Sequence, residues 1–176
     1  GHAVLVRTSS KSLLYDTGPR YSPETDAGQR VLVPLLFALG ERLDRVVISH
    51  QDSDHSGGAN SVLKMQPQAD VLASIPSDHL LRTTHPMQTC TAGQQWQWDG
   101  VYFSVLHPQQ ADYVKKFKPN ALSCVLRIES ASGKSALLVG DIEATQENQL
   151  VQSGVNLKSD WLLVPHHGSA TSSTQS

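Results

Sequence analysis

The most constraining feature of this sequence is an apolar strand that runs directly into a loop crowded with histidine and aspartate. Leu43–Ser49 is short and apolar at its centre, which is typical of a buried strand. The next nine residues, His50–Gly58, read His-Gln-Asp-Ser-Asp-His-Ser-Gly-Gly. Four side chains of types that bind metal ions therefore fall within six positions. The closing glycines permit a tight turn into a short helix, which we expect over Ala59–Met65.

The spacing in this loop favours metal binding. In an extended segment His50 and Asp52 point the same way, because residues i and i+2 share a face. Asp54 and His55 lie one turn further along the loop and are offset from His50 and Asp52, so they can bind a second ion. Mixed imidazole and carboxylate ligands suit zinc, manganese or iron, and they argue against an all-sulfur structural site.

Two simpler interpretations compete with a metal site. A polar turn in which Asp54 or Ser56 caps the following helix needs no ion, but it leaves both histidines and the other aspartate without a role. A calcium loop of the EF-hand type fits the start of the segment, Asp52-x-Asp54-x-Ser56-Gly57. That loop requires a glutamate at its twelfth position, where this chain has Leu63, so the calcium interpretation fails.

Two later strands also deliver ligand-type side chains at their ends. The apolar segment Ala136–Val139 is followed by a glycine and Asp141, and Trp161–Val164 is followed by a proline and His166–His167. An isolated Gly-Asp after a strand is more often a turn than a ligand. Because three strands in one short chain are each followed by ligand-type side chains, the pattern favours a metal-binding role for each of the three groups.

The remaining pattern predicts a mixed α/β (α+β) domain. Ala3–Arg7 and Ser12–Tyr15 form a predicted hairpin. A helix is expected over Ala27–Leu39 with Asp26 as its N-cap, and Pro34 inside this span predicts a kink or a later start. Further strands are expected at Val71–Ala73, Gln94–Trp98, Val101–Leu106 and Cys124–Ile128, and a further helix at Glu143–Gln152. Since hairpins and strand–helix alternation both occur, we expect mixed sheets.

Composition limits the classes of function. The 176 residues suit one domain, and 14 basic residues against 16 acidic ones give a net charge of −2. This balance disfavours a broadly basic nucleic-acid-binding surface, although metal ions can hold phosphates in its place. No apolar run approaches the roughly 18–20 residues of a membrane span. The two cysteines, Cys90 and Cys124, have no CxxC spacing, and we expect each to be a buried apolar side chain.

Taken in order, these motifs resemble those of the metallo-β-lactamase superfamily. The general motif of that superfamily, H-x-H-x-D-H, resembles His50–His55, with Asp52 in place of the second histidine. With this aspartate, the motif resembles that of one branch of the superfamily, the soluble domain of ComEC-type DNA-uptake channel proteins of bacterial competence. Further segments that resemble this branch are Leu14–Gly18, His107–Pro108, Asn120-x-x-Ser123 and Val164–Ser169.

The resemblance implies a four-layer αββα sandwich, formed by residues 1–176 as a single domain. It also implies that the chain is an excerpt of a larger membrane protein, truncated at both ends. This soluble domain would lie on the periplasmic or extracytoplasmic side of the inner cell membrane. The expected partners are single-stranded DNA, as substrate, and the membrane-channel portion of the same polypeptide. The oligomeric state is not predicted.

The resemblance further implies a site for two divalent ions, Mn or Zn. Its ligands would be His50 and Asp52 for the first ion, Asp54 and His55 for the second, Asp141 as a bridge, and His166 to complete the second site. The oxygen-rich ligand set favours manganese over zinc. Asn120 stands where the superfamily places a third histidine of the first site. His107 is an alternative donor, and it can equally be structural.

Catalytic and substrate-binding roles follow from the same resemblance. Asp54 and His167 are the candidate catalytic residues, and His167 either protonates a leaving oxygen or supports His166. Asp16, at a strand end, is expected to orient a ligand histidine. The candidate substrate-binding residues are Asn120, Ser123 and Ser169.

The function implied is that of a metal-dependent hydrolase, most directly a nuclease that degrades one DNA strand during uptake. Two alternatives stay open. One is a hydrolase of thioesters or lactones on the same fold. The other is a catalytically weak binding or gating module of a DNA-uptake channel. A basic segment beside Tyr113 and Phe117 either contacts single-stranded nucleic acid or is a solvated loop, and its lysines are Lys115, Lys116 and Lys118.

Overall fold

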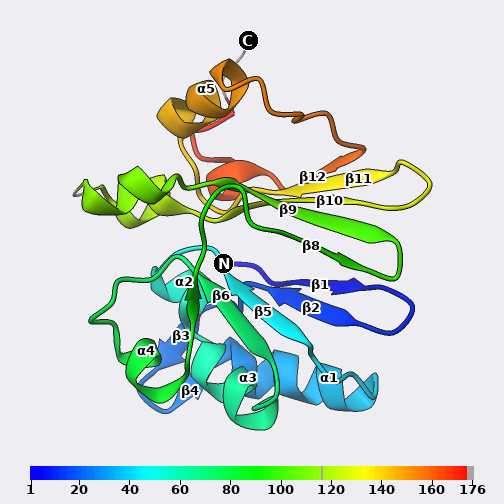
Figure 1. Ribbon diagram of the computed structural model, residues 1–176. Helices are drawn as coiled ribbons and strands as arrows, with labels where there is room; N and C mark the ends of the chain where they lie inside the picture. Colours follow the sequence, from blue (N-terminus) through cyan, green and yellow to red (C-terminus); the bar gives the residue numbers. More distant parts are fainter. Residues whose placement is uncertain (116, 174–176) are drawn as a thin grey trace. The chain divides into compact units, whose positions relative to one another are not determined.

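The structure, a computed structural model, describes residues 1–115 and 117–173. The chain divides into two compact units, Gly1–Thr89 and Cys90–Ser176. Each unit contains a sheet with parallel and antiparallel neighbours, together with short helices (Figure 1). The mixed α/β class is therefore confirmed, and the single-domain organisation of residues 1–176 stays a prediction. Lys116, which belongs to the predicted basic segment, lies outside the described residues.

The sheet of the first unit has five strands in the order β1-β2-β5-β6-β7. β1 and β2 form the predicted antiparallel hairpin, whereas β5, β6 and β7 run parallel to β2. A parallel arrangement brings the carboxyl ends of β2 and β5 to the same edge, so the loops that follow them meet. The strand bounds are Val4–Arg7 for β1, Ser12–Tyr15 for β2, Arg45–Ile48 for β5, Asp70–Ala73 for β6 and Gln88–Thr89 for β7.

The predicted helix over 27–39 is present in two parts. A π-helical turn, η1 (Gly28–Leu32), passes into α1 (Val33–Ala38), with Pro34 in the first turn of α1. Proline is tolerated there because the first helical N–H groups have no partner within the helix. The Asp26 carboxylate accepts a hydrogen bond from the Gln29 N–H at 2.8 Å, which confirms its capping role.

The remaining elements of the first unit are short. A small hairpin, which the sequence did not predict, joins the end of β2 to η1. The bounds are Arg20–Ser22 for β3, Thr25–Asp26 for β4, Ser53–Ser56 for α2, Ala59–Met65 for α3 and Leu80–Thr84 for α4. α1 and α3 cover one face of the first sheet (Figure 1). Their buried side chains pack against those of β5 and β6 in one apolar cluster.

Three backbone segments of the first unit approach one another without intervening side chains. A Cβ atom added to Gly58 would lie 2.3 Å from the Thr17 carbonyl oxygen and 2.5 Å from the Gly28 nitrogen. A Cβ atom on Gly28 would lie 2.2 Å from the Gly58 carbonyl oxygen. The glycine pair that closes the histidine–aspartate loop is therefore required by packing, because it lets α3 start against η1 and the loop after β2.

We predict that Gly58→Ala lowers the free energy of unfolding by about 1–3 kcal/mol, because the new methyl group clashes with backbone atoms that cannot move aside as a flexible side chain could. Urea denaturation followed by circular dichroism measures the effect. Asn60→Ala, at an exposed position of the same helix, is the control and should change stability by less than about 0.5 kcal/mol. Equal effects of the two substitutions would contradict the packing argument.

The second unit holds a five-stranded sheet in the order β12-β11-β10-β9-β8. β8 to β11 are antiparallel neighbours, and β12 is parallel to β11. α5 begins one residue later than predicted, behind a capping box formed by Glu143 and Gln146. The bounds are Gln95–Trp98 for β8, Val101–His107 for β9, Val125–Glu129 for β10, Ser135–Leu138 for β11, Trp161–Leu162 for β12, Gln110–Val114 for η2, Pro119–Leu122 for η3, Ala144–Gln152 for α5 and Pro165–Gly168 for η4.

Among the described residues, no helix has both the length and the apolar character needed to cross a membrane.

The two cysteines are buried as predicted, but the prediction of plain apolar side chains is wrong because they form a disulfide. Cys90 and Cys124 form a disulfide with their Cα atoms 6.0 Å apart, and both side chains are fully buried. Both residues lie at the His107 end of β9: the Cys90 Sγ is 4.0 Å from the His107 carbonyl oxygen, and Val125 pairs with His107. The sequence separation of 34 residues conceals this proximity, which arises only from the pairing of β9 with β10.

Reduction of this disulfide should lower the free energy of unfolding by roughly 3–4 kcal/mol, since the bond closes a loop of 34 residues in the unfolded chain. Guanidinium denaturation with and without dithiothreitol measures the difference. The double variant Cys90→Ala/Cys124→Ala is the control and should not respond to the reductant. A wild-type protein equally stable in both conditions would contradict a structural role for the bond.

Candidate metal centre

In the first unit, the loops after β2 and β5 are tied together by backbone hydrogen bonds. The Asp16 N–H donates to the Val47 carbonyl at 2.8 Å, and the Thr17 N–H donates to the His55 carbonyl at 2.8 Å. The Thr17 hydroxyl donates to the same His55 carbonyl. These bonds hold the histidine–aspartate loop against the end of β2, as the parallel pairing of β2 with β5 requires.

Asp16 is the centre of this arrangement. Its carboxylate is fully buried and accepts hydrogen bonds from the Ser49 N–H at 2.7 Å and the Ser49 hydroxyl at 2.8 Å. The same carboxylate lies 2.7 Å from His55 Nδ1 and 3.4 Å from His2 Nε2. Burial alone would raise the pKa of Asp16, but the hydrogen bonds from His2, His55 and Ser49 outweigh it and hold the pKa well below its usual range. The predicted orienting role of Asp16 therefore has a direct structural basis.

The two loop histidines are oriented through their Nδ1 atoms. His55 Nδ1 contacts Asp16, and His50 Nδ1 lies 2.9 Å from the Ser49 hydroxyl. Both imidazoles are fully buried. When one ring nitrogen is engaged in this way, the other is directed to a single position, which is how proteins orient histidine ligands of metal ions.

The Nε2 atoms of these histidines face the loop carboxylates. His50 Nε2 is 3.6 Å from Asp52 Oδ2, and His55 Nε2 is 3.4 Å from Asp54 Oδ2. The carboxylates are partly exposed, at 44% for Asp52 and 41% for Asp54, so solvent reaches them while the imidazoles are held inside. Two imidazole–carboxylate pairs with anchored rings suit a divalent transition metal. The first unit therefore fits the predicted metal ligands.

The competing interpretation, a helix cap, has little support. The N-cap of α3 is Gly58, which has no side chain with which to cap. The Ser56 hydroxyl donates to the carbonyls of Gln51 and Asp52. Ser56 thus stabilises the turn of the loop and leaves the start of α3 to backbone packing.

We predict that Asp16→Asn weakens metal binding by about 10- to 100-fold, because an amide cannot anchor His55 as a buried carboxylate does. Competition with a chromophoric chelator measures the affinity. Asp70→Asn, at a largely exposed position at the start of β6, is the control and should bind metal as the wild type does. Thermal unfolding in excess chelator separates a loss of affinity from a loss of folding. Unchanged affinity in a folded Asp16→Asn variant would contradict the orienting role.

The second unit collects the other predicted ligands at the end of β11. Asp141 is buried, and its N–H donates to the Ser123 hydroxyl at 3.1 Å. His167 Nε2 lies 3.5 Å from Asp141 Oδ2, with the His167 side chain 38% exposed. The predicted substrate residue Ser123 therefore supports the Asp141 backbone. In this unit His167 makes with Asp141 the same kind of imidazole–carboxylate pair as those in the first unit.

His166 has different neighbours. Its Nδ1 lies 2.9 Å from the Thr171 hydroxyl, and its Nε2 lies 3.3 Å from the Asn120 amide nitrogen. The predicted residues Asn120 and His166 are thus in contact. Ser169 donates its N–H to the His166 carbonyl at 2.8 Å, and its hydroxyl faces that of Thr171. The ligand role of His166 stays a prediction, and the geometry favours His167 as the partner of Asp141.

Backbone conformation also marks these residues. Asp16, His166 and His167 all have positive φ angles, of 60°, 47° and 52°. Non-glycine residues seldom adopt this region, and where they do the surrounding contacts must hold them there. Three of the residues under discussion for the metal centre are therefore held by the fold in uncommon conformations.

His107 makes a structural contact. Its imidazole is buried, and Nε2 donates to the Ala121 carbonyl at 2.9 Å, which fixes η3 against the end of β9. A nitrogen that donates a hydrogen bond cannot bind a metal ion at the same time. Burial lowers the pKa of His107 although the Ala121 hydrogen bond and Asp112 act in the opposite direction.

The lowered pKa of His107 makes a pH prediction. In the folded protein His107 resists protonation, whereas the unfolded chain takes up the proton near the usual pKa of about 6.5. Its contribution to stability is therefore present above about pH 6.5 and is lost as the pH falls towards the lower folded pKa, by at most about 1.4 kcal/mol per pH unit. His107→Gln, which keeps a donor for Ala121, should lose less stability between pH 7 and pH 5. Identical pH profiles in urea denaturation would contradict this account.

Comparison with known proteins agrees with the site. The family model described as "Metallo-beta-lactamase superfamily" matches residues 1–85, which include the whole loop after β5. The solved MIM-2 metallo-β-lactamase has a TM-score of 0.62 with this chain at 16% identity, covering 93% of this chain and 69% of that one. The chain belongs to the metallo-β-lactamase superfamily, whose fold implies binding of divalent metal, typically zinc.

Within that superfamily, the chain is similar to a competence protein and to a recombination protein. Competence protein ComA of Neisseria gonorrhoeae is 42% identical over 176 residues, and Recombination protein 2 of Haemophilus influenzae is 34% identical over 175 residues. Each match covers 99% of this chain but only 23% and 21% of those relatives, so the chain spans less than a quarter of their length. Hydroxyacylglutathione hydrolase of Aeromonas salmonicida is 30% identical over 103 residues, covering 58% of this chain and 36% of that one.

Proposed function

We propose that this chain is a metal-dependent phosphodiesterase that hydrolyses DNA and degrades one strand during uptake. The observation that carries the proposal is the set of imidazole–carboxylate pairs at strand ends, with the two buried histidines of the first unit anchored through Nδ1. Such sites serve hydrolysis in general, and the similarity to Competence protein ComA and Recombination protein 2 supports DNA as the proposed substrate.

We assign two divalent ions, Mn or Zn, to these side chains. His50, Asp52, Asp54 and His55 are the proposed ligands in the first unit, and Asp141 and His166 are those in the second. When bound, such ions lower the pKa of a bound water and neutralise charge on a phosphodiester. They would also supply the positive charge that a chain of net charge −2 does not offer a polyanion.

The residues of the chain have their own tasks in this proposal. His167, which is partly exposed and lies 3.5 Å from Asp141, can deliver a proton to the leaving oxygen. Asn120 and Ser169 can donate hydrogen bonds to phosphate oxygens. Ser123 acts indirectly, because its hydroxyl accepts the N–H of Asp141 and so positions that carboxylate.

A second candidate function is hydrolysis of thioesters or lactones. The observation in its favour is the similarity to hydroxyacylglutathione hydrolase. A third is a catalytically weak binding or gating module of a DNA-uptake channel. In that case the chain would bind DNA but would hydrolyse neither DNA nor ester reporters.

We also propose where the domain works. The buried disulfide fits an oxidising compartment, which supports a periplasmic or extracytoplasmic position. Because the chain spans less than a quarter of ComA, we assign the membrane-channel portion to the remainder of the same polypeptide.

Asp54→Ala and Asp141→Ala should each lower metal-dependent hydrolysis of DNA at least about 100-fold, because loss of a ligand costs more than loss of its supporting residue. Labelled single-stranded DNA incubated with Mn²⁺, Zn²⁺ or Mg²⁺ and resolved on gels measures the rate, and a thioester reporter runs in parallel. Asp70→Ala and Asp160→Ala, at exposed positions of the two units, are the controls and should keep wild-type rates. Unchanged cleavage by either ligand variant would refute the proposal, and turnover of the thioester alone would favour the second function.

A further inference from the structure

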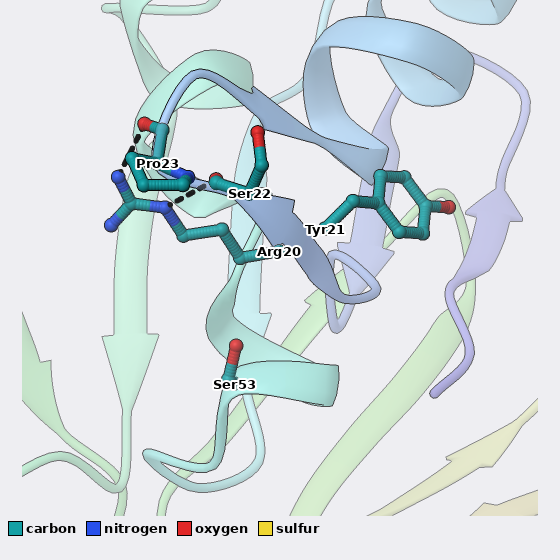
Figure 2. Close-up of a pocket in the computed structure, with 5 residues that line it drawn as sticks. All are labelled: Arg20, Tyr21, Ser22, Pro23 and Ser53. Carbon is teal, nitrogen blue, oxygen red and sulfur yellow. Dashed lines mark hydrogen bonds between the residues drawn. The ribbon is translucent and has the colours of Figure 1, made fainter.

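The β3–β4 hairpin forms a hollow next to the metal-binding loop. The hollow has a volume of about 350 Å³, and it is lined by Arg20, Tyr21, Ser22, Pro23 and Ser53 (Figure 2). Ser53 stands in the loop between the candidate ligands Asp52 and Asp54, and its side chain is exposed. A molecule in this hollow would therefore lie beside the candidate metal ligands of the first unit.

The hairpin is fixed against that loop by direct backbone contact. A Cβ atom added to Gly57 would lie 2.2 Å from the Arg20 nitrogen and 2.7 Å from the Pro19 carbonyl carbon. The end of α2 thus packs on the start of β3 with no side chain between them. Because the two backbone segments are in direct contact, the position of the hairpin relative to Asp52 and Asp54 is fixed by packing.

Arg20 is prepared to bind an anion. Its Nε donates to the Ser22 carbonyl at 3.0 Å and its Nη2 donates to the Pro23 carbonyl, as the dashed lines of Figure 2 show. Within the described part of the chain, no acidic side chain pairs with this guanidinium, and the residue is exposed. A guanidinium held flat by its own hairpin loses little conformational freedom when it binds a phosphate.

Tyr21 offers an exposed aromatic ring in the same hollow. Its side chain is 53% exposed, and Figure 2 shows it projecting from β3 on the opposite side from Arg20. The guanidinium carbon of Arg30, in η1, lies 5.7 Å from the centre of the Tyr21 ring. Arginines beside an exposed aromatic ring are how proteins hold single-stranded nucleic acid without regard to sequence.

The acidic side chains of the hairpin, Glu24 and Asp26, each accept hydrogen bonds. Glu24 accepts a hydrogen bond from the Ser22 hydroxyl at 3.0 Å. Asp26 accepts from the Gln29 N–H and from the Ser61 hydroxyl. Arg20 and Arg30 are both exposed, in a protein whose net charge is −2.

We propose that Arg20, Tyr21 and Arg30 form a subsite for a single-stranded nucleic acid, in which Arg20 and Ser53 bind a backbone phosphate and Tyr21 stacks on a neighbouring base. This inference rests on the proposed function, because it names how a DNA strand is held beside the reacting phosphodiester. The subsite recognises the strand by its phosphates and by the flat face of any base.

Fluorescence anisotropy with a labelled oligothymidylate in chelator tests the subsite without hydrolysis. Tyr21→Ala should weaken binding about tenfold, as expected for the loss of one stacked base, and Tyr21→Phe should bind as the wild type does. Tyr102→Ala is the matched control, because Tyr102 is 54% exposed on β9, and it should leave binding unchanged. An oligonucleotide without bases should not distinguish Tyr21→Ala from wild type.

The salt dependence of the same binding tests Arg20. Each phosphate neutralised on a single strand contributes about −0.7 to the slope of log affinity against log salt concentration. Arg20→Gln should therefore make that slope shallower by about 0.7. Arg42→Gln is the control, since this exposed arginine precedes β5, at the opposite end of the strand from the metal-binding loop. Circular dichroism confirms that each variant is folded.

The outcomes separate this inference from the proposed function. A wild-type chain that binds the oligonucleotide through Tyr21 and Arg20 but does not hydrolyse it would support the subsite and refute the nuclease. A chain that cleaves DNA while Tyr21→Ala and Arg20→Gln bind with wild-type affinity and slope would overturn the subsite alone. A wild-type chain with no measurable affinity for the oligonucleotide would also overturn the subsite.

Discussion

A buried carboxylate joins the two strand-end loops of the first unit. Asp16 sits after β2 in a left-handed conformation and receives hydrogen bonds from both groups of Ser49, after the neighbouring strand β5. It also contacts His2, and its contact with Nδ1 orients the His55 ring. A charge can be buried here because it is surrounded by donors, and those donors belong to the loop that it organises. The imidazole–carboxylate pairs of the first unit therefore depend on the buried Asp16 carboxylate, which does not itself face solvent.

Much of the fold could be predicted because the relevant patterns are local. Apolar runs such as Leu43–Ser49 and the capping aspartate Asp26 act within a few residues, and both are present in the structure. The kink or delayed start expected at Pro34 is the passage from η1 to α1. The Cys90–Cys124 disulfide could not be predicted in this way, because only the pairing of β9 with β10 brings the two residues together.

The candidate site shows the same difference between local patterns, which can be predicted, and tertiary contacts, which cannot. Residue types and spacing predict the histidines and aspartates as candidate ligands, because the side chains themselves carry the ligand chemistry, and this assignment stays a prediction. Their supporting contacts were harder to predict: the role of Ser49 and the hydrogen bond from His107 to Ala121 arise from tertiary packing. The β3–β4 hairpin was missed because it has only five strand residues and no apolar alternation. The sequence feature related to it is the Gly57–Gly58 pair of the later loop, because the backbone at the start of β3 packs directly against Gly57.

The central claim is that these histidines and aspartates bind divalent metal, and elemental analysis of the purified wild-type chain tests it most directly. The protein is loaded with Mn²⁺ or Zn²⁺, dialysed against metal-free buffer and measured by mass spectrometry. We expect divalent ion to be retained at between one and two equivalents per chain, and its removal by chelator to lower the unfolding temperature. A folded protein that retains no ion, and whose unfolding temperature does not respond to either metal, would contradict the claim.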